Sequence, residues 1–171
     1  PATSTPPFSA ASDVYKRQIL INIEKAAQEI GAEMRFFSST VLTATAGGFL
    51  AGGSGGVGSI TWGTVWDEGN ILGVTVVTIE EEPQILTLTT PQEMKAVIHN
   101  CGLTCIIADL TFALAPRQPW EQYVAAFDTF EDAVRFGESL AVDESTILRL
   151  VTPLEWPIPS FFRQLVREDA C

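Results

Sequence analysis

The sequence predicts an α+β fold in which a mainly antiparallel sheet is flanked by helices. Three features indicate this class: an apolar repeat at helical spacing near the start, two β-branched segments separated by a turn, and a long apolar segment that ends before residue 116. With 171 residues, 46% of them hydrophobic, the chain is long enough to bury one substantial core. We therefore expect a globular protein.

The first expected element is a helix over residues 19–30. Apolar residues recur there at helical spacing, and Gly31 stands where a helix C-cap belongs. Residues 34–37 are expected to form a short strand. A glycine-rich region follows and is treated separately below.

Four more elements are expected before residue 116. Residues 71–80 are β-branched and bounded by turn residues, so they predict a strand, and residues 85–89 predict its hairpin partner. Residues 91–99 begin with proline at a first-turn position and predict a short helix. Residues 103–114 predict a long apolar strand.

Composition changes beyond Pro119, where a second domain is expected. Residues 121–128 alternate like a strand, residues 130–140 carry a helical apolar stripe, and residues 146–151 again predict a strand. Residues 156–159 contain two prolines and are expected to break any regular element. The result is a β-α-β unit that is cut short at the end of the chain.

Residues 1–18 differ in composition from the rest. Residues 1–12 are rich in Pro, Ser, Thr and Ala without periodicity, as in a disordered leader. Residues 13–18 resemble the translation of a transposase adapter end used in shotgun sequencing libraries. We therefore expect residues 1–18 to be a non-native or disordered leader outside the fold. On that interpretation the chain is a fragment.

Charge and cysteine content exclude several classes of protein. The formal net charge of −11 argues against a nucleic-acid partner, because phosphate backbones require clustered Lys and Arg. No apolar run reaches the length of a membrane span, so no transmembrane segment is expected. The three cysteines do not suggest a disulfide framework, which favours a reducing, cytoplasmic location.

The densest glycine cluster lies in residues 44–58, which hold seven of the 13 glycines. Glycine permits sharp turns and close approach of the backbone to another molecule. Such a loop can present several N–H groups to an anion, typically a phosphate or diphosphate. The sequence therefore predicts a nucleotide-binding loop whose main-chain amides contact a diphosphate.

Two common nucleotide loops do not fit this cluster. Residues 53–58 match G-x-G-x-x-G, but that pattern is meaningful only between a strand and a helix. Residues 59–66 are β-branched and aromatic, so no helix is expected to begin there. A P-loop is excluded because no Gly-Lys-Ser/Thr follows the glycines.

Residues 34–116 resemble the second half of the FAD-binding domain of the p-cresol methylhydroxylase and vanillyl-alcohol oxidase superfamily. The likeness is greatest to its FAD-linked oxidase branch, which contains glycolate oxidase subunits and D-lactate dehydrogenases. Five segments match in the expected order: residues 39–48, 52–58 (GGSGGVG), 62–67 (WGTVWD), the strand around 74–77 (VTVV) and 99–109 (HNCGLTCIIAD). Each segment is weak alone, but their order is fairly specific.

The resemblance implies FAD as cofactor and assigns residues to it. Those expected to line FAD or lie beside its nucleotide part are Thr45, Gly47, Gly48, Gly52, Gly53, Ser54, Gly55, Gly102, Leu103, Thr104, Cys105, Ile106 and Ile107. Two of the matched positions depart from the family pattern. Cys105 replaces a glycine, where its side chain could crowd the nucleotide, and Ala108 replaces a common threonine.

By this resemblance, residues 19–116 form the second, incomplete FAD-binding subdomain, and residues 117–171 form the start of a cap or substrate domain. The parent protein would be a flavin-dependent oxidoreductase that oxidises an alcohol or 2-hydroxy acid, a small-molecule substrate, by hydride transfer to FAD. The family's other diphosphate-binding loop has no counterpart here. We therefore expect the isolated chain to bind FAD weakly or not at all.

Two alternatives stay open: a non-catalytic binding module that keeps the fold, and a flavin-dependent reductase such as those of cell-wall precursor synthesis. No catalytic residue is assigned, and partner subunits and electron acceptor are unknown. His99 is expected to have a packing or helix-end role. Cys101 and Cys105 lack the further ligands of a metal site, so no metal is expected. The acidic residues 80–82 are expected in a solvated turn.

Overall fold

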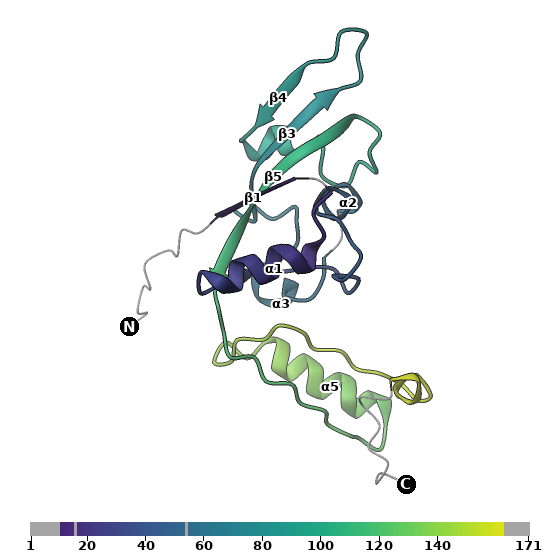
Figure 1. Cartoon of the computed structure of the whole chain (residues 1–171). Helices are drawn as coiled ribbons and strands as arrows, with labels where there is room; N and C mark the ends of the chain where they lie inside the picture. The colour runs from purple at the N-terminus through teal and green to yellow at the C-terminus, as the bar shows by residue number, and fades with distance from the viewer. Residues whose placement is uncertain (1–10, 16, 54, 163–171) are drawn as a thin grey trace. The chain divides into compact units, whose positions relative to one another are not determined.

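The computed structural model of the chain describes residues 11–15, 17–53 and 55–162 (Figure 1). It divides into two compact units, Pro1–Gln118 and Pro119–Cys171. The first unit combines helices with an antiparallel sheet of five strands, which confirms the predicted α+β class. No helix in the described ranges is both long and apolar enough to cross a bilayer.

Strand β5 organises the sheet because it pairs with three other strands along its length of 12 residues (Figure 1). The strand order is β1-β5-β3-β4, and β2 pairs with the far end of β5. All pairings are antiparallel. The strands are β1 (Ala11–Tyr15), β2 (Ala32–Met34), β3 (Ile71–Thr78), β4 (Ile85–Leu88) and β5 (Cys105–Pro116).

Alternation along β3 and β5 builds the centre of the core. Val74 lies opposite Leu110, and both are almost fully buried. Val76 lies opposite Ile107 in the next inward position, after an irregularity that follows Thr75. Because successive strand residues point to opposite faces, these positions of β3 and β5 share the inward face. The last residues of β5 before Pro116 are buried on both faces, which fits the long apolar segment that predicted this strand.

Two helices pack against this core. Helix α1 (Leu20–Glu29) buries its apolar stripe and ends at Gly31, whose φ of +73° only glycine adopts readily. Helix α2 (Ala46–Gly52) begins where the Thr45 hydroxyl accepts a hydrogen bond from the Gly48 amide at 3.3 Å. Both helices therefore have recognisable end signals in the sequence.

Two single-turn helices differ from expectation. Helix α3 (Ser59–Trp62) forms where no helix was expected, after Gly58 at φ +105°. The Rossmann pattern still fails, since α2 and not a strand precedes the glycines. Helix α4 (Pro91–Met94) starts with the predicted proline but ends before residue 99. The short strand predicted at residues 34–37 forms earlier in the chain, as β2 at Ala32–Met34.

Residues 11–15 form part of the sheet, although the sequence placed them in a leader outside the fold. They pair with β5 from Ala11 opposite Ala113 to Tyr15 opposite Asp109. Residues 1–10 and Lys16 lie outside the described residues. Whether residues 1–18 are native stays a prediction, but the expectation that all of them lack structure is wrong for β1.

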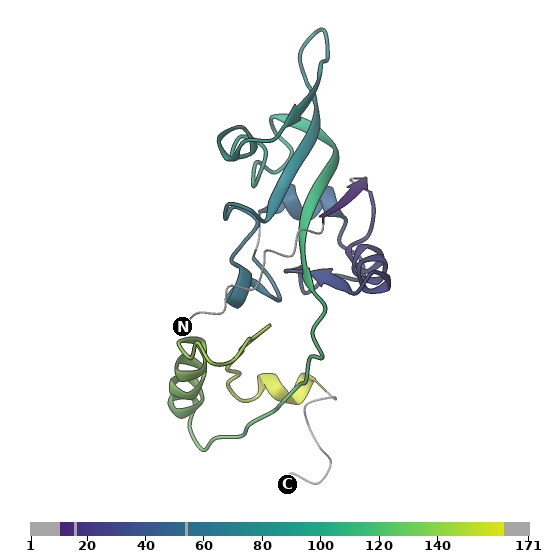
Figure 2. The same cartoon turned by 90° about the vertical axis from the view of Figure 1, so that its left-hand side faces the viewer.

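The second unit contains helix α5 (Phe130–Ala141), as predicted, and the short 3-10 helix η1 (Ile158–Phe161). The strands predicted at residues 121–128 and 146–151 are wrong, because no strand forms in the described part of this unit. Both segments run beside α5 without a sheet partner (Figures 1 and 2). Residues 156–159 were expected to break regular structure, yet η1 begins there.

Contacts with α5 explain the alternating apolar residues of these two segments. The rings of Phe127 and Phe136 lie 5.3 Å apart. Gly137 is buried, and a Cβ built on it would lie 3.4 Å from a Val151 methyl and 3.2 Å from Pro153. The apolar residues thus pack against a helix. Alternating apolar residues form a strand only where another strand lies beside them to pair with, and here none does in the described part of this unit.

Candidate functional site

The structure brings together two segments that the sequence assigned to one cofactor. The loop that follows α4 packs against the C-terminal end of α2. The His99 amide donates to the Leu50 carbonyl at 3.1 Å, and the Cys101 amide donates to the Ala51 carbonyl at 3.0 Å. The His99 imidazole Nδ1 lies 2.5 Å from the Gly52 carbonyl oxygen. His99 therefore has the helix-end role expected of it.

Around this junction the backbone is open to solvent at three glycines. Gly48, Gly52 and Gly102 are exposed, and a Cβ built on Gly52 or Gly102 would meet no atom within 4 Å. Leu103 is 77% exposed on the same segment as Gly102. Ile106 is 49% exposed, but it lies on β5 between the core residues Cys105 and Ile107 and so faces the other side of the sheet. We call Gly48, Gly52, Gly102 and Leu103 the glycine surface. It offers bare backbone and one apolar side chain to a molecule lying against it.

Other residues assigned to the cofactor have roles inside the protein. Gly47, Gly53, Cys105 and Ile107 are buried, and Cys105 belongs to the core. The Cys105 side chain therefore does not occupy the exposed surface on which it was expected to crowd a nucleotide.

Two polar residues of the set are also used internally. The Thr45 hydroxyl caps α2, and the Thr104 hydroxyl donates to the Ala96 carbonyl at 3.1 Å. Gly55 is half-buried. Ser54 lies outside the described residues.

Many amides of the glycine cluster are already hydrogen-bonded within the protein. Seven of them donate to oxygen atoms of the chain itself: Ala44, Ala46, Gly48, Phe49, Gly53, Gly56 and Val57. An N–H group that donates to a protein oxygen is not available to a phosphate in the same conformation. These seven donors are therefore not available to the expected diphosphate, and any diphosphate contact must use other groups.

Positive charge is sparse in this part of the chain. Lys95 is the only lysine or arginine between Arg35 and Arg117. Within the described ranges, no group of three His, Cys, Asp or Glu side chains is arranged to hold a metal ion. This part of the chain thus offers few charged groups that would pair with a diphosphate.

His99 and Cys101 adopt left-handed backbone conformations, with φ of 57° and 54°. They are the two non-glycine residues with positive φ in the part of the chain that the structure describes. Such conformations are costly and concentrate at functional sites. No local pattern predicts this strain, because the contact that holds the loop comes from α2, about 50 residues earlier in the chain.

Arg35 is a second residue whose importance the sequence did not indicate. Its guanidinium lies 4.9 Å from the centre of the Trp62 ring and donates to the Gly69 carbonyl and the Asn70 Oδ1, at 2.9 and 3.2 Å. Burial lowers the pKa of Arg35. Asn70 in turn donates to the carbonyls of Trp62 and Thr64 at 2.7 and 2.9 Å. This network fixes the loop at residues 62–70.

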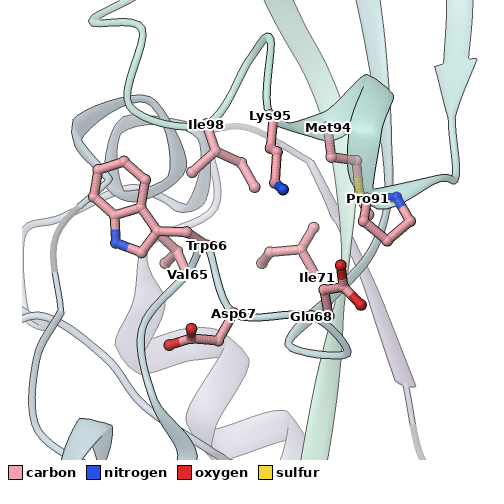
Figure 3. Close-up of a pocket in the computed structure, with 9 residues that line it drawn as sticks. All are labelled: Val65, Trp66, Asp67, Glu68, Ile71, Pro91, Met94, Lys95 and Ile98. Atoms are coloured by element: carbon pink, nitrogen blue, oxygen red, sulfur yellow. The ribbon is translucent and has the colours of Figure 1, made fainter.

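That loop forms one wall of a small pocket, with α4 and the residues after it on the other side (Figure 3). The pocket has an empty volume of about 260 Å³, including its opening to solvent. Its floor is apolar, and three charged residues lie at its edge. Trp66 connects it to the loop after α4, because the rings of Trp66 and His99 lie 4.5 Å apart in an edge-on arrangement.

No protein-family profile matches the chain, and no curated protein matches it in sequence. A solved structure of alkyldihydroxyacetonephosphate synthase does match in three dimensions, with a TM-score of 0.56 over 69% of this chain. At 17% sequence identity the match shows a shared fold with that part of the synthase. The matched portion is 21% of the synthase chain, so this chain spans about a fifth of that structure.

Proposed function

We propose that the chain supplies the second half of the FAD-binding domain of a flavin-dependent oxidoreductase that oxidises an alcohol or a 2-hydroxy acid. The observation that carries the proposal is the hydrogen-bonded contact of residues 50–52 with residues 99–101, which brings the family-matched segments 45–58 and 99–109 together. The FAD-linked oxidase-like fold supports it independently of the motifs. The branch with glycolate oxidase subunits and D-lactate dehydrogenases is part of the proposal.

The glycine surface would contact the cofactor through its backbone and one apolar side chain. Gly52 and Gly102 allow close approach because no side chain covers them. Leu103 would lose exposed apolar area against a flat ring system. A bound flavin supplies the redox chemistry by accepting a hydride from the substrate. The residues of this chain hold and shield it, and none is assigned to catalysis.

The diphosphate would depend mainly on groups from elsewhere in a longer polypeptide. Seven amides of the cluster already donate hydrogen bonds within the chain, and Lys95 is the only lysine or arginine between Arg35 and Arg117. We therefore expect this chain alone to bind FAD weakly, and a longer polypeptide from the same reading frame to purify with bound flavin. A glycine-rich turn encoded upstream of residue 19 would support this.

The test is a titration of the full chain with FAD, followed by flavin fluorescence. Leu103→Glu places a charge on the glycine surface and should weaken binding about fivefold or more. Ile85→Glu is the matched control, since Ile85 is 74% exposed on β4 and Leu103 is 77% exposed. Equal effects of the two substitutions, or FAD binding that neither one changes, would contradict the proposed surface.

Catalysis needs a separate measurement on the longer polypeptide. Bleaching of the flavin absorbance by alcohols or 2-hydroxy acids, without oxygen, would establish oxidation and indicate the substrate. The internally bonded amides favour one rival function, a module that keeps the fold without redox chemistry. This rival function would be supported if a longer polypeptide bound flavin but no alcohol or 2-hydroxy acid reduced that flavin.

A further inference from the structure

Strands β3, β4 and β5 carry apolar side chains on the face of the sheet that points away from the core. Val74 and Val76 of β3 are buried, so Val77 points to the opposite face. Val77 lies opposite Ile85 of β4 and Ile106 of β5. Ile85 is 74% exposed, Ile106 is 49% exposed and Val77 is half-buried. These three side chains form one row across the three strands, which we call the outer row.

The opposite face of the sheet at this end is covered by the chain itself. Val76 and Ile107 lie opposite each other there, and both belong to the core together with Met94 of α4 and Val97. The outer row has no comparable cover, because two of its three members are exposed. An apolar row that stays in contact with water in the middle of a sheet is a candidate surface for a partner.

Carboxylates border the outer row on two opposite sides. On one side, Asp109 of β5 lies half-buried opposite Thr75 of β3, whose side chain shares the outward face with Val77. On the other side, residues 80–82 are three exposed glutamates in the turn that joins β3 to β4. Figure 1 shows this turn at the far end of the hairpin. The outer row therefore lies between two sources of negative charge.

These charges decide which class of occupant is favoured. The sole ion pair among the described residues joins Arg135 and Asp132, so no described lysine or arginine forms an ion pair with the bordering carboxylates. A second copy of the chain, docked through the same face, would bring its own carboxylates beside them, and like charges repel. An occupant with basic residues on both sides of an apolar surface is attracted instead.

The width of the outer row fits a helix. Neighbouring strands lie about 4.8 Å apart, so a row across three strands is about 10 Å wide, close to the diameter of an α-helix. A basic amphipathic helix presents an apolar stripe with lysine or arginine on either side of it. This pattern is complementary to an apolar row with carboxylates on two sides.

We propose that the outer row binds a basic amphipathic helix of another protein. The apolar stripe of that helix lies on Val77, Ile85 and Ile106, and its basic residues lie beside Asp109 and the acidic turn. The site stands independently of the flavin proposal, because none of these residues belongs to the glycine surface. Salt should weaken the binding without abolishing it, since salt screens the charges and leaves the apolar contact.

The probe is a short synthetic helix with leucine on one face and lysine on the remainder, added to the full chain without flavin and followed by NMR. We expect saturable shifts of the methyl signals of Val77, Ile85 and Ile106. The methyl signals of Ile30, which is 67% exposed at the end of α1, should not shift.

Two control peptides separate charge from shape. In one, glutamate replaces every lysine. The other has the composition of the probe with its leucines scattered around the helix, so that it has no apolar stripe. The probe should bind about tenfold more tightly than either, because only the probe matches both the row and its border.

Substitutions in the outer row test the apolar contact. Ile85→Thr and Ile106→Thr remove apolar area and keep a β-branched side chain that suits a strand. Each should raise the dissociation constant of the probe about fivefold. Ile30→Thr makes the same change away from the sheet and should have no effect. Far-UV circular dichroism establishes that each variant is folded.

Substitutions at the border test the charges. Asp109→Asn and Glu81→Gln should each raise the dissociation constant about threefold in low salt, the size of an exposed ion pair, and should have little effect in high salt. Asp128→Asn and Glu29→Gln remove the same charges at exposed positions elsewhere in the chain and serve as their controls.

Four results would overturn the proposal. The first is the absence of saturable shifts, and the second is equal binding of the probe and the scattered peptide, which would leave only attraction between charges. The third is probe binding that is unchanged in both Ile85→Thr and Ile106→Thr. The fourth is self-association of the full chain in sedimentation experiments that Ile85→Thr abolishes, since a second copy would then cover the row. Failure of the FAD titration would leave the outer row unaffected, so the two proposals fail separately.

Discussion

The imidazole Nδ1 of His99 lies 2.5 Å from the carbonyl oxygen of Gly52, 47 positions earlier in the chain. The same loop leaves no room at the next residue, because a Cβ built on Gly53 would lie 2.2 Å from the Cβ of His99. Gly53 also has φ of +59°, and His99 has φ of 57°. The end of α2 and the loop after α4 are thus fitted to each other by two left-handed residues.

Substitution at Gly53 should be far more costly than substitution at Gly52. Gly53→Ala combines a left-handed backbone with a steric conflict, so it should lower the free energy of unfolding by about 3 kcal/mol. Gly52→Ala adds a methyl in open space at a helical position and should be neutral or stabilising by up to about 1 kcal/mol. Urea denaturation of both variants measures the difference.

The conflict at Gly53 should be relieved by shortening His99. In a His99→Gly background, Gly53→Ala should cost about 1–2 kcal/mol less than it does in the original chain, because the side chain that blocks its methyl is gone. A double-mutant cycle gives this coupling energy. Additive effects would mean that the loop and α2 are not packed against each other in solution.

Asn70 should tolerate very little change. It is 2% exposed, and its amide group donates to two backbone carbonyls, those of Trp62 and Thr64. Asn70→Asp replaces two donors by a carboxylate facing carbonyl oxygens, and should lower the free energy of unfolding by about 3 kcal/mol at neutral pH. Acid should restore part of this loss, because a protonated carboxyl donates one hydrogen bond.

The matched control for Asn70 is Asn22→Asp, since Asn22 is exposed in the first turn of α1. A carboxylate there should be neutral or slightly stabilising near the helix N-terminus. Thermal unfolding of both variants across the acid range provides the comparison. Similar curves for the two would show that the loop at residues 62–70 is not fixed by Asn70.

Glu93 should make stability depend on pH in the acid range. The Thr90 hydroxyl and the amides of Thr90 and Thr89 donate hydrogen bonds to its carboxylate, which lowers the pKa of Glu93. A carboxyl whose pKa is lower in the folded state stabilises the fold above its unfolded pKa. That stabilisation is lost as pH falls through the folded pKa, where the carboxylate takes up a proton.

The pH profile of Tm measures this contribution. The original chain should have a higher Tm than Glu93→Gln near neutral pH, and the two should converge in acid. Glu82→Gln removes an equal charge from the turn between β3 and β4 and should give no such convergence. If Thr90→Val left the acid dependence unchanged, the capping box at the start of α4 would not be its source.

Local sequence patterns predicted those helices and strands whose apolar residues are arranged as their packing in the fold requires. The stripe of α1, the hairpin of β3 and β4, and the long strand β5 were each readable because one face of the element is apolar. Alternation failed for residues 121–128, where the side chains contact α5 and no strand is adjacent. A strand depends on its neighbour, and a single segment does not specify that neighbour.

Only part of the candidate site follows from the sequence. The motif order located the two segments that meet at His99 and Gly52, but not which of their groups are available. Cys105 was expected to face a nucleotide. Its position on β5 instead directs its side chain into the core, as it does for Ile107. Likewise, the sequence does not show that amides of the glycine cluster donate hydrogen bonds within the protein. The Val57 amide, for example, donates to the Phe37 carbonyl, which folding brings beside it.

Strand β1 provides a direct test of whether the unusual first residues belong to the fold. Because Ala11–Tyr15 pair with Asp109–Ala113, removing residues 1–17 should unpair one edge of β5. We expect a lower Tm, faster hydrogen exchange at the amides of β5 that β1 covers, and a greater tendency to self-associate. Removing residues 1–10 alone should leave all three unchanged. If both truncations behaved like the full chain, residues 11–15 would contribute nothing to the sheet, and their assignment to a non-native leader would be strengthened.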